Sequence, residues 1–187
     1  MREAVETIPP NMSEPSAQIK PGTPAPDFTL TDQSGNDWSL SDRIGKVVLL
    51  LFYPANETLV CTRQLCSLRD NWSKYLDTKA EIVGISSGSR EANEAFASKY
   101  RLPLPILADE DRTVTSIYAK HWLLPLNLMR GLTVIDARGM VRTHQTMLRA
   151  FRPNDHDVIL RLYAARAEAI EDRRNELRAR VRRMILG

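Results

Sequence analysis

The chain contains two cysteines, Cys61 and Cys66, which lie five positions apart shortly after a long apolar run. Two thiols so close together can serve catalysis, redox sensing or metal binding, or can simply be buried. Proline cannot continue a ladder of strand hydrogen bonds, so the apolar strand is expected to end at Pro54. A helical stretch begins a few residues after Thr58, which places Cys61 in or next to its first turn.

This position in the helix gives Cys61 a chemical advantage. The first turn has N–H groups without helical partners and carries the positive end of the helix dipole, and both stabilise an anion. The thiolate is the reactive form of cysteine, so a thiol held there is favoured as a nucleophile. Cys61 is therefore the candidate nucleophile of the chain.

The five-residue spacing sets a different condition for Cys66. Five helical residues turn through roughly 500° and rise about 7.5 Å, which leaves the two side chains about 140° apart. A disulfide needs Cα atoms within about 7 Å of each other and side chains that converge. An intact helix thus forbids a bond between Cys61 and Cys66, and residues 60–67 must unwind if the two sulfurs pair.

Alternating strands and helices are expected to hold this pair of cysteines in place. Apolar and β-branched runs predict a hairpin at 27–40 and strands at 46–54, 80–87, 104–109, 132–137 and 141–147. Helical patterns cover 62–75, 89–100 and 111–119, and one long helix is expected from Asp155 onward. This order predicts an α/β fold, and a hairpin at each end makes its central sheet mixed.

The composition limits the class of protein. With 43% hydrophobic and 26% charged residues, the chain of 187 residues has the composition of an ordinary globular domain. Its longest apolar run, 47–53, is far shorter than the roughly 20 residues that cross a bilayer. Residues 1–20 lack the apolar segment of a secretion signal. We therefore expect a cytoplasmic protein without a membrane span, in which a structural disulfide is not favoured.

The residues around the cysteines resemble a known family. Pro54, Thr58 and Cys61, in the pattern P-x3-T-x2-C, are similar to the active-site loop of the peroxiredoxins, the alkyl hydroperoxide reductase/thiol-specific antioxidant superfamily. The Cys61-x4-Cys66 spacing resembles the bacterioferritin-comigratory-protein class in particular. The resemblance covers about residues 20–165 and extends to three further segments, 20–42, 84–114 and 130–141. It implies a thioredoxin fold, with a central mixed sheet flanked by helices, an N-terminal hairpin and a long C-terminal helix.

The resemblance also implies an activity, that of a thiol-dependent peroxidase acting on hydrogen peroxide and organic hydroperoxides. Cys61 would form a sulfenic acid, Cys66 would resolve it as an intramolecular disulfide, and thioredoxin or a similar dithiol would reduce the disulfide. Thr58 would hydrogen-bond the peroxide and Pro54 would shield the thiolate from water. Arg130 would stabilise the thiolate and polarise the substrate. No cofactor or metal is expected, because the cysteines and histidines lack metal-ligand spacing.

A second hypothesis uses the same chemistry without catalysis. The oxidation of Cys61 would then be the switch of a non-enzymatic redox sensor or partner-binding protein, with the basic C-terminal helix as its output. The two hypotheses differ in turnover. An enzyme supplied with a dithiol consumes many equivalents of peroxide, whereas a sensor consumes a single one.

The sequence departs from the family pattern near the site. Leu59 and Val60 stand where the class usually has Pro-Gly, which removes a rigid residue and a permissive one from the loop. Gly131 follows Arg130 where an apolar strand residue is usual. The segment 121–130 is unusually apolar and is expected to form a hydrophobic rim or a contact surface.

Three regions are expected along the chain: a flexible extension at 1–20, the thioredoxin-fold peroxiredoxin domain at 21–163 and a basic helical extension at 164–187. The last region carries seven arginines and four acidic residues. A heptad pattern predicts a seam of a and d positions on one face of the helix. The a positions are Leu160, Ala167, Arg174 and Val181, and the d positions are Tyr163, Ile170, Leu177 and Met184.

The seam has three possible partners. The helix can pack one stripe on its own domain, form a homodimer through a coiled coil, or lie as a basic helix on nucleic acid or an acidic membrane surface. Nucleic acid is disfavoured, because no aromatic stacking positions interleave with the arginines.

Overall fold

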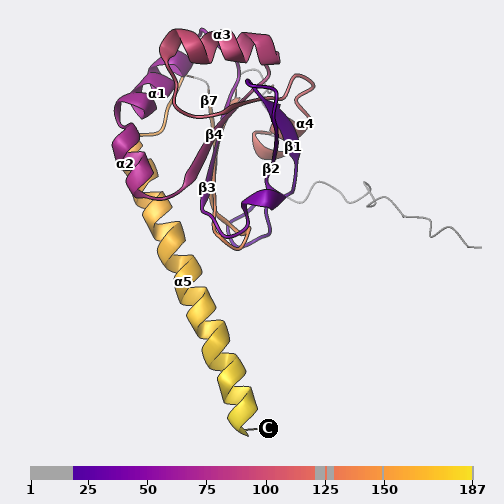
Figure 1. The fold of residues 1–187 in the computed structure, drawn as a ribbon, viewed down its shortest axis with the longest axis vertical. Coiled ribbons are helices and arrows are strands. Elements are labelled where there is room, and N and C mark those ends of the chain that lie inside the picture. Colours follow the sequence, from indigo (N-terminus) through magenta and orange to yellow (C-terminus); the bar gives the residue numbers. More distant parts are fainter. Residues whose placement is uncertain (1–18, 121–124, 126–128, 149, 187) are drawn as a thin grey trace, which may run out of the picture.

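The computed structural model describes residues 19–120, 125, 129–148 and 150–186. Within these residues the strands form one seven-stranded mixed sheet in the order β2-β1-β5-β4-β3-β6-β7 (Figure 1). The strands are β1 Thr29–Asp32, β2 Asp37–Ser39, β3 Val48–Tyr53, β4 Glu81–Ser86, β5 Ile106–Ala108, β6 Met129–Ile135 and β7 Val141–Leu148. The predicted mixed α/β fold, with a hairpin at each end, is confirmed.

Helices connect the strands and cover both faces of the sheet. They are the short 3₁₀ helix η1 Ser41–Arg43, α1 Leu59–Asp70, α2 Trp72–Asp77, α3 Arg90–Tyr100, α4 Thr113–Tyr118 and α5 Asp155–Leu186. The prediction of one helix over 62–75 was wrong, because Asn71 leaves helical geometry with φ −101° and ψ 14° and separates two helices. The long helix from Asp155 is confirmed, and it passes residue 164 without a break.

Strand β3 lies at the centre of the sheet and is buried along its whole length. Its odd-numbered residues, such as Leu49 and Leu51, pack in one cluster with α1, α2, α3 and α5. Its even-numbered residues, such as Leu50 and Phe52, pack in a second cluster with the β1–β2 hairpin and α4 (Figure 1). A strand that alternates between two cores has to be apolar throughout, which explains the continuous apolar run.

The pairing of β3 with β6 brings two distant segments to one end of the sheet. The strands are antiparallel, and Phe52 lies opposite Gly131. Arg130 therefore lies beside the end of β3, where the chain turns toward α1. The predicted strand at 132–137 begins earlier, at Met129, and this earlier start places Arg130 inside β6.

Helix α5 is held on the body by a short apolar stripe. Val158, Leu162, Ala165 and Ala169 are buried, at spacings that put them on one face of a helix. The C-terminal part of α5 then projects away from the sheet (Figure 1). Among the described residues, no helix is both long and apolar enough to cross a membrane.

Ion pairs add to this attachment. Arg138 in the β6–β7 turn and Arg142 in β7 face three acidic residues of α5, and Arg142 also bonds the buried Asp136 at 2.7 Å. The pairs that cross to α5 are Arg138–Asp172, Arg138–Glu176, Arg142–Glu168 and Arg142–Asp172. Three of the four acidic side chains of the basic extension thus pair with the body of the protein. The helix surface that faces away from the body is left mainly with arginines.

The predicted seam is a different stripe from the one that packs on the body. Every seam position is exposed in the structure: Leu160, Tyr163, Ala167, Ile170, Arg174, Leu177, Val181 and Met184. The alternative in which the helix packs one stripe on its own domain is confirmed, but the packed stripe lies between the seam positions and is not the seam itself.

Candidate active site

Thr58 and Cys61 form the start of helix α1. Thr58 is the N-cap, with φ −76° and ψ 141°, and its Oγ1 accepts a hydrogen bond from the backbone N of Cys61 at 3.4 Å. Threonine is a favoured residue at this position because its oxygen satisfies an N–H that has no helical partner. Cys61 is completely buried in the first turn. The predicted place of Cys61 in the first helical turn is confirmed, while the helix begins directly after Thr58 and not a few residues later.

Arg130 reaches the sulfur of Cys61 from the neighbouring strand. Its Nη2 donates to Cys61 Sγ at 2.8 Å, and the side chain is buried. Burial lowers the pKa of Arg130 from its ordinary value, and attraction to Cys61 opposes that shift. Guanidinium groups keep their charge in proteins, so a buried cation faces the thiol. Such a cation favours the thiolate, the form that attacks peroxides.

Gln64 is a site residue that sequence reasoning missed. It lies one helical turn after Cys61 on the same face of α1, is largely buried, and accepts a hydrogen bond from Arg130 Nη1. The Gln64 amide oxygen thus holds Nη1 of the guanidinium, while Nη2 points at the Cys61 sulfur. An amide three residues after a candidate nucleophile in a helix is the signal that could have identified it.

Gly131 is explained by the space around β6. A Cβ at this position would lie 3.1 Å from the Phe52 ring, 3.2 Å from the backbone oxygen of Tyr118 and 3.3 Å from Ala119. These distances leave little room for a side chain. The glycine allows α4 and β3 to approach β6 closely, next to Arg130.

The loop between β3 and α1 is anchored on the β4–α3 segment. Pro54 ends the strand as predicted, and its carbonyl oxygen accepts a hydrogen bond from Ser87 Oγ at 3.0 Å. Asn56 Nδ2 donates to Asn93 Oδ1 at 2.8 Å. Glu57, in the left-handed region with φ 61°, pairs with Lys99 of α3 at 2.8 Å. These contacts hold the segment just before Thr58.

Cys66 stands apart from the group around Cys61. It lies five residues further along the continuous helix α1, is half-buried, and both cysteines are free thiols. The structure therefore shows the geometry expected to forbid a disulfide until the helix opens. Of the apolar segment 121–130, residues 121–124 and 126–128 lie outside the described residues. Met129 and Arg130, at its end, are buried in β6.

Comparison with known proteins gives a consistent result. The model of the AhpC/TSA family matches residues 21–144. Peroxiredoxin Q, chloroplastic, from Sedum lineare is 41% identical over 145 residues, which are 75% of this chain and 75% of that protein. Peroxiredoxin Q, chloroplastic, from Triticum aestivum is 42% identical over 130 residues, 67% of this chain and 58% of that protein.

A solved structure is similar over most of the chain. The crystal structure of peroxidoxin BcpB from Mycobacterium tuberculosis superposes with a TM-score of 0.67 at 30% sequence identity, covering 79% of this chain and 99% of that one. A buried arginine on a thiol at a helix start, beside a mixed sheet of this topology, is the arrangement of a thiol-based peroxidase with the thioredoxin fold. The chain belongs to the AhpC/TSA family and is a peroxiredoxin.

Proposed function

We propose that this peroxiredoxin reduces hydrogen peroxide and organic hydroperoxides through Cys61, with Cys66 as the resolving cysteine. The contact between Arg130 Nη2 and Cys61 Sγ, at 2.8 Å, carries the proposal. It directs a positive charge at the one thiol that also occupies the first turn of a helix. Both features favour a thiolate, and Cys66 lies outside the first turn of the helix.

In the first step the Cys61 thiolate attacks one peroxide oxygen. A sulfur–oxygen bond forms, the O–O bond breaks, and the leaving oxygen departs as hydroxide or alkoxide and takes a proton. Arg130 is placed to stabilise the charge that moves onto the oxygens, and burial strengthens this attraction. The hydroxyl hydrogen of Thr58 can donate to the peroxide, because its oxygen already accepts from Cys61 N. Pro54 limits the access of water.

In the second step the thiol of Cys66 attacks the sulfenic acid. A disulfide forms and water leaves, so the oxidising equivalent passes to the pair of cysteines. This step requires the helix to open over residues 60–67. A dithiol protein such as thioredoxin then reduces the disulfide and restores two thiols.

Steady-state turnover of the chain and of Cys66→Ser with thioredoxin tests this proposal. The unaltered chain should consume many equivalents of peroxide per molecule, whereas Cys66→Ser should consume one and then stop. Mass spectrometry should find sulfenic or over-oxidised Cys61 accumulating in the variant. A single equivalent consumed by the unaltered chain would favour the redox-sensor hypothesis, and unchanged cycling by Cys66→Ser would show that Cys66 is only a packed thiol.

We also propose that the chain is cytoplasmic and that the exposed seam of α5 binds a second copy of the chain. Both cysteines are free thiols, the state that a reducing compartment maintains, and this supports the location. The heptad spacing supports the dimer, because two identical helices can bury the same stripe against each other. The exposed fractions of Ile170, Leu177 and Met184 are 55%, 62% and 79%, which leaves apolar area for a partner to cover.

The charge pattern limits how tightly such a dimer can hold. Beyond Glu176, α5 carries arginines at 178, 180, 182 and 183 and no acidic residue. Arg174 also interrupts the apolar a positions. Two copies therefore repel each other along the same stripe that joins them. The dimer should be weak, and salt should strengthen it by screening the arginines.

Truncation after Glu176 tests the dimer without disturbing the body. It removes Leu177, Val181 and Met184 but keeps the buried stripe and the ion pairs to Arg138 and Arg142. Peroxidase activity should persist, while the average mass in sedimentation should fall and lose its dependence on concentration. An unchanged mass would show that the seam is not the interface. Self-association that weakens with salt would contradict the expected repulsion between the arginines of the two copies.

A further inference from the structure

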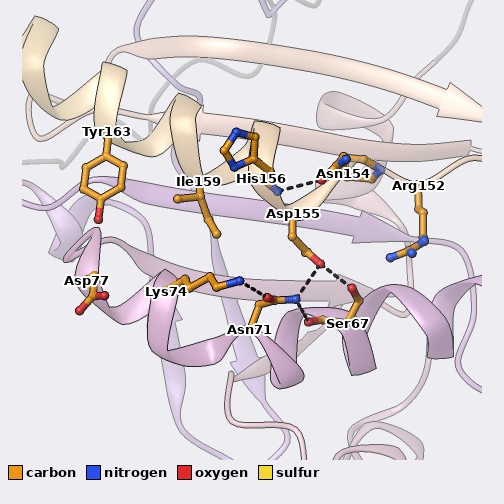
Figure 2. Close-up of a pocket in the computed structure, with 11 residues that line it drawn as sticks. Ser67, Asn71, Lys74, Asp77, Arg152, Asn154, Asp155, His156, Ile159 and Tyr163 are labelled. Carbon is orange, nitrogen blue, oxygen red and sulfur yellow. Dashed lines mark hydrogen bonds between the residues drawn. The ribbon is translucent and has the colours of Figure 1, made fainter.

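Asp155, the first residue of helix α5, binds the helix that carries both cysteines. Ser67 Oγ of α1 donates to Asp155 Oδ2, and Asn71 Nδ2, at the end of α1, donates to the same oxygen at 3.4 Å (Figure 2). Tyr75 of α2 donates to Asp155 Oδ1 at 2.7 Å. Burial and this hydrogen bond raise the pKa of Tyr75 well above its usual range, so its hydroxyl keeps the proton that it donates.

The position of Ser67 links these hydrogen bonds to the unwinding of α1 that the resolution step requires. Ser67 follows Cys66 directly, so the carboxylate of Asp155 holds the chain at the C-terminal border of the segment that must unwind. At the other border, Ser87, Asn93 and Lys99 hold the loop before Thr58. A cavity of about 640 Å³ opens beside α1, α2 and the start of α5 (Figure 2). The opening of α1 is therefore confined between two anchored ends.

We infer that Asp155 is a positioning residue for the resolution step, through its hydrogen bond to Ser67. It stabilises the helical form of α1 in which Cys61 meets peroxide, and opposes the open form in which Cys66 meets the Cys61 sulfenic acid. The inference rests on the proposed role of Cys66. It makes the start of the tail helix a determinant of how long the sulfenic acid survives.

The lifetime of the sulfenic acid decides between two outcomes. Either Cys66 attacks it, giving a disulfide and water, or a second peroxide molecule oxidises it further to the sulfinic acid and leaves as water or alcohol. A stronger hydrogen bond from Ser67 to Asp155 slows disulfide formation and leaves more time for over-oxidation. The bond between Asp155 and Ser67 therefore sets the sensitivity of the enzyme to excess peroxide.

Ser67→Ala tests the inference, with Tyr75→Phe as the matched control. Both variants remove one hydrogen bond to the same carboxylate, but only Ser67 adjoins the segment that opens. In rapid-quench alkylation experiments, disulfide formation should be about tenfold faster or more in Ser67→Ala, the effect of losing one bond to a charged acceptor. It should be unchanged in Tyr75→Phe. The rate of Cys61 oxidation should match the unaltered chain in both, and over-oxidation should need more peroxide in Ser67→Ala.

The inference is overturned if Ser67→Ala forms the disulfide no faster than the unaltered chain, or if Tyr75→Phe accelerates it equally. Asp155→Ala should reproduce Ser67→Ala, and adding Ser67→Ala to it should give no further acceleration. An unaltered chain that forms no disulfide would contradict the proposed role of Cys66. In that case hydrogen exchange in the reduced chain tests the role of Asp155 independently of Cys66. The exchange rate of the amides of residues 59–67 must still rise in Ser67→Ala and must not rise in Tyr75→Phe.

Discussion

Cys61→Ser should lower peroxide consumption to the rate measured without enzyme. A serine hydroxyl is far less acidic and less nucleophilic than a thiol, so neither the helix start nor Arg130 can make it attack an O–O bond at neutral pH. The exchange replaces one buried sulfur by a smaller oxygen and leaves Gln64 to hold the guanidinium. Peroxide consumption with a thioredoxin supply, followed continuously, measures the effect.

The same variant also tests which thiol reacts first, because it keeps Cys66. Its thermal unfolding midpoint should stay close to that of the unaltered chain, which separates lost chemistry from lost structure. Residual consumption that disappears only in the double variant Cys61→Ser/Cys66→Ser would make Cys66 a peroxidatic thiol and would contradict the assignment.

Arg130→Met should slow the reaction of Cys61 with peroxide by roughly two orders of magnitude, the usual cost of removing one charge-stabilising donor from an active site. Methionine keeps much of the length and apolar volume of the arginine stem, but it removes the cation from the sulfur and the donor from Gln64. Stopped-flow measurement of the oxidation step isolates this effect from resolution and recycling. Alkylation of Cys61 by iodoacetamide should slow as well, because the cation that faces the reactive sulfur is gone.

Arg142→Met is the matched control for this substitution. Arg142 is a half-buried arginine on the same sheet, but it pairs with Asp136 and Asp172 and not with a cysteine. The control should lower the thermal stability and leave the oxidation rate near that of the unaltered chain. Equal rates for Arg130→Met and the unaltered chain would place the reactive cation elsewhere.

The local features of the site could be predicted because neighbouring residues determine them. A proline ends β3, a threonine caps α1, and the spacing between them and Cys61 leaves the cysteine in the first helical turn. Each of these depends on backbone geometry within a few residues. The placement of Arg130 was reached through the family resemblance, since no local rule joins it to Cys61.

The partners that escaped prediction come from distant parts of the chain. Gln64 meets Arg130 across 66 positions, and Ser67 meets Asp155 across 88. Such pairs depend on which strand lies beside which and on where the tail helix crosses α1. No periodicity or turn signal carries that information, so a lone glutamine or aspartate in a helix looks like an ordinary surface residue.

In helix α5 the heptad pattern was identified correctly, but it did not predict which stripe of the helix packs on the sheet. The heptad spacing of α5 is real, yet the sheet selects the stripe with Ala165 and Ala169, whose small side chains allow the helix to lie close. The larger seam residues, such as Leu177, remain outside. Side-chain size at the crossing point, and not apolarity alone, decides which stripe packs.

The confinement of both cysteines to one helix has a consequence for the covalent chain. Between them lies a single basic residue, Arg63, which is exposed on the continuous helix of the reduced protein. A backbone wound into a helix is protected from a protease such as trypsin, and the opening that the disulfide requires removes this protection. A cut after Arg63 in the oxidised protein would leave two fragments tied by the very bond that exposed the site. The two fragments would separate only after a reductant breaks the disulfide. Cleavage at Arg63, seen as two fragments on a reducing gel, would therefore identify the molecules that had been oxidised.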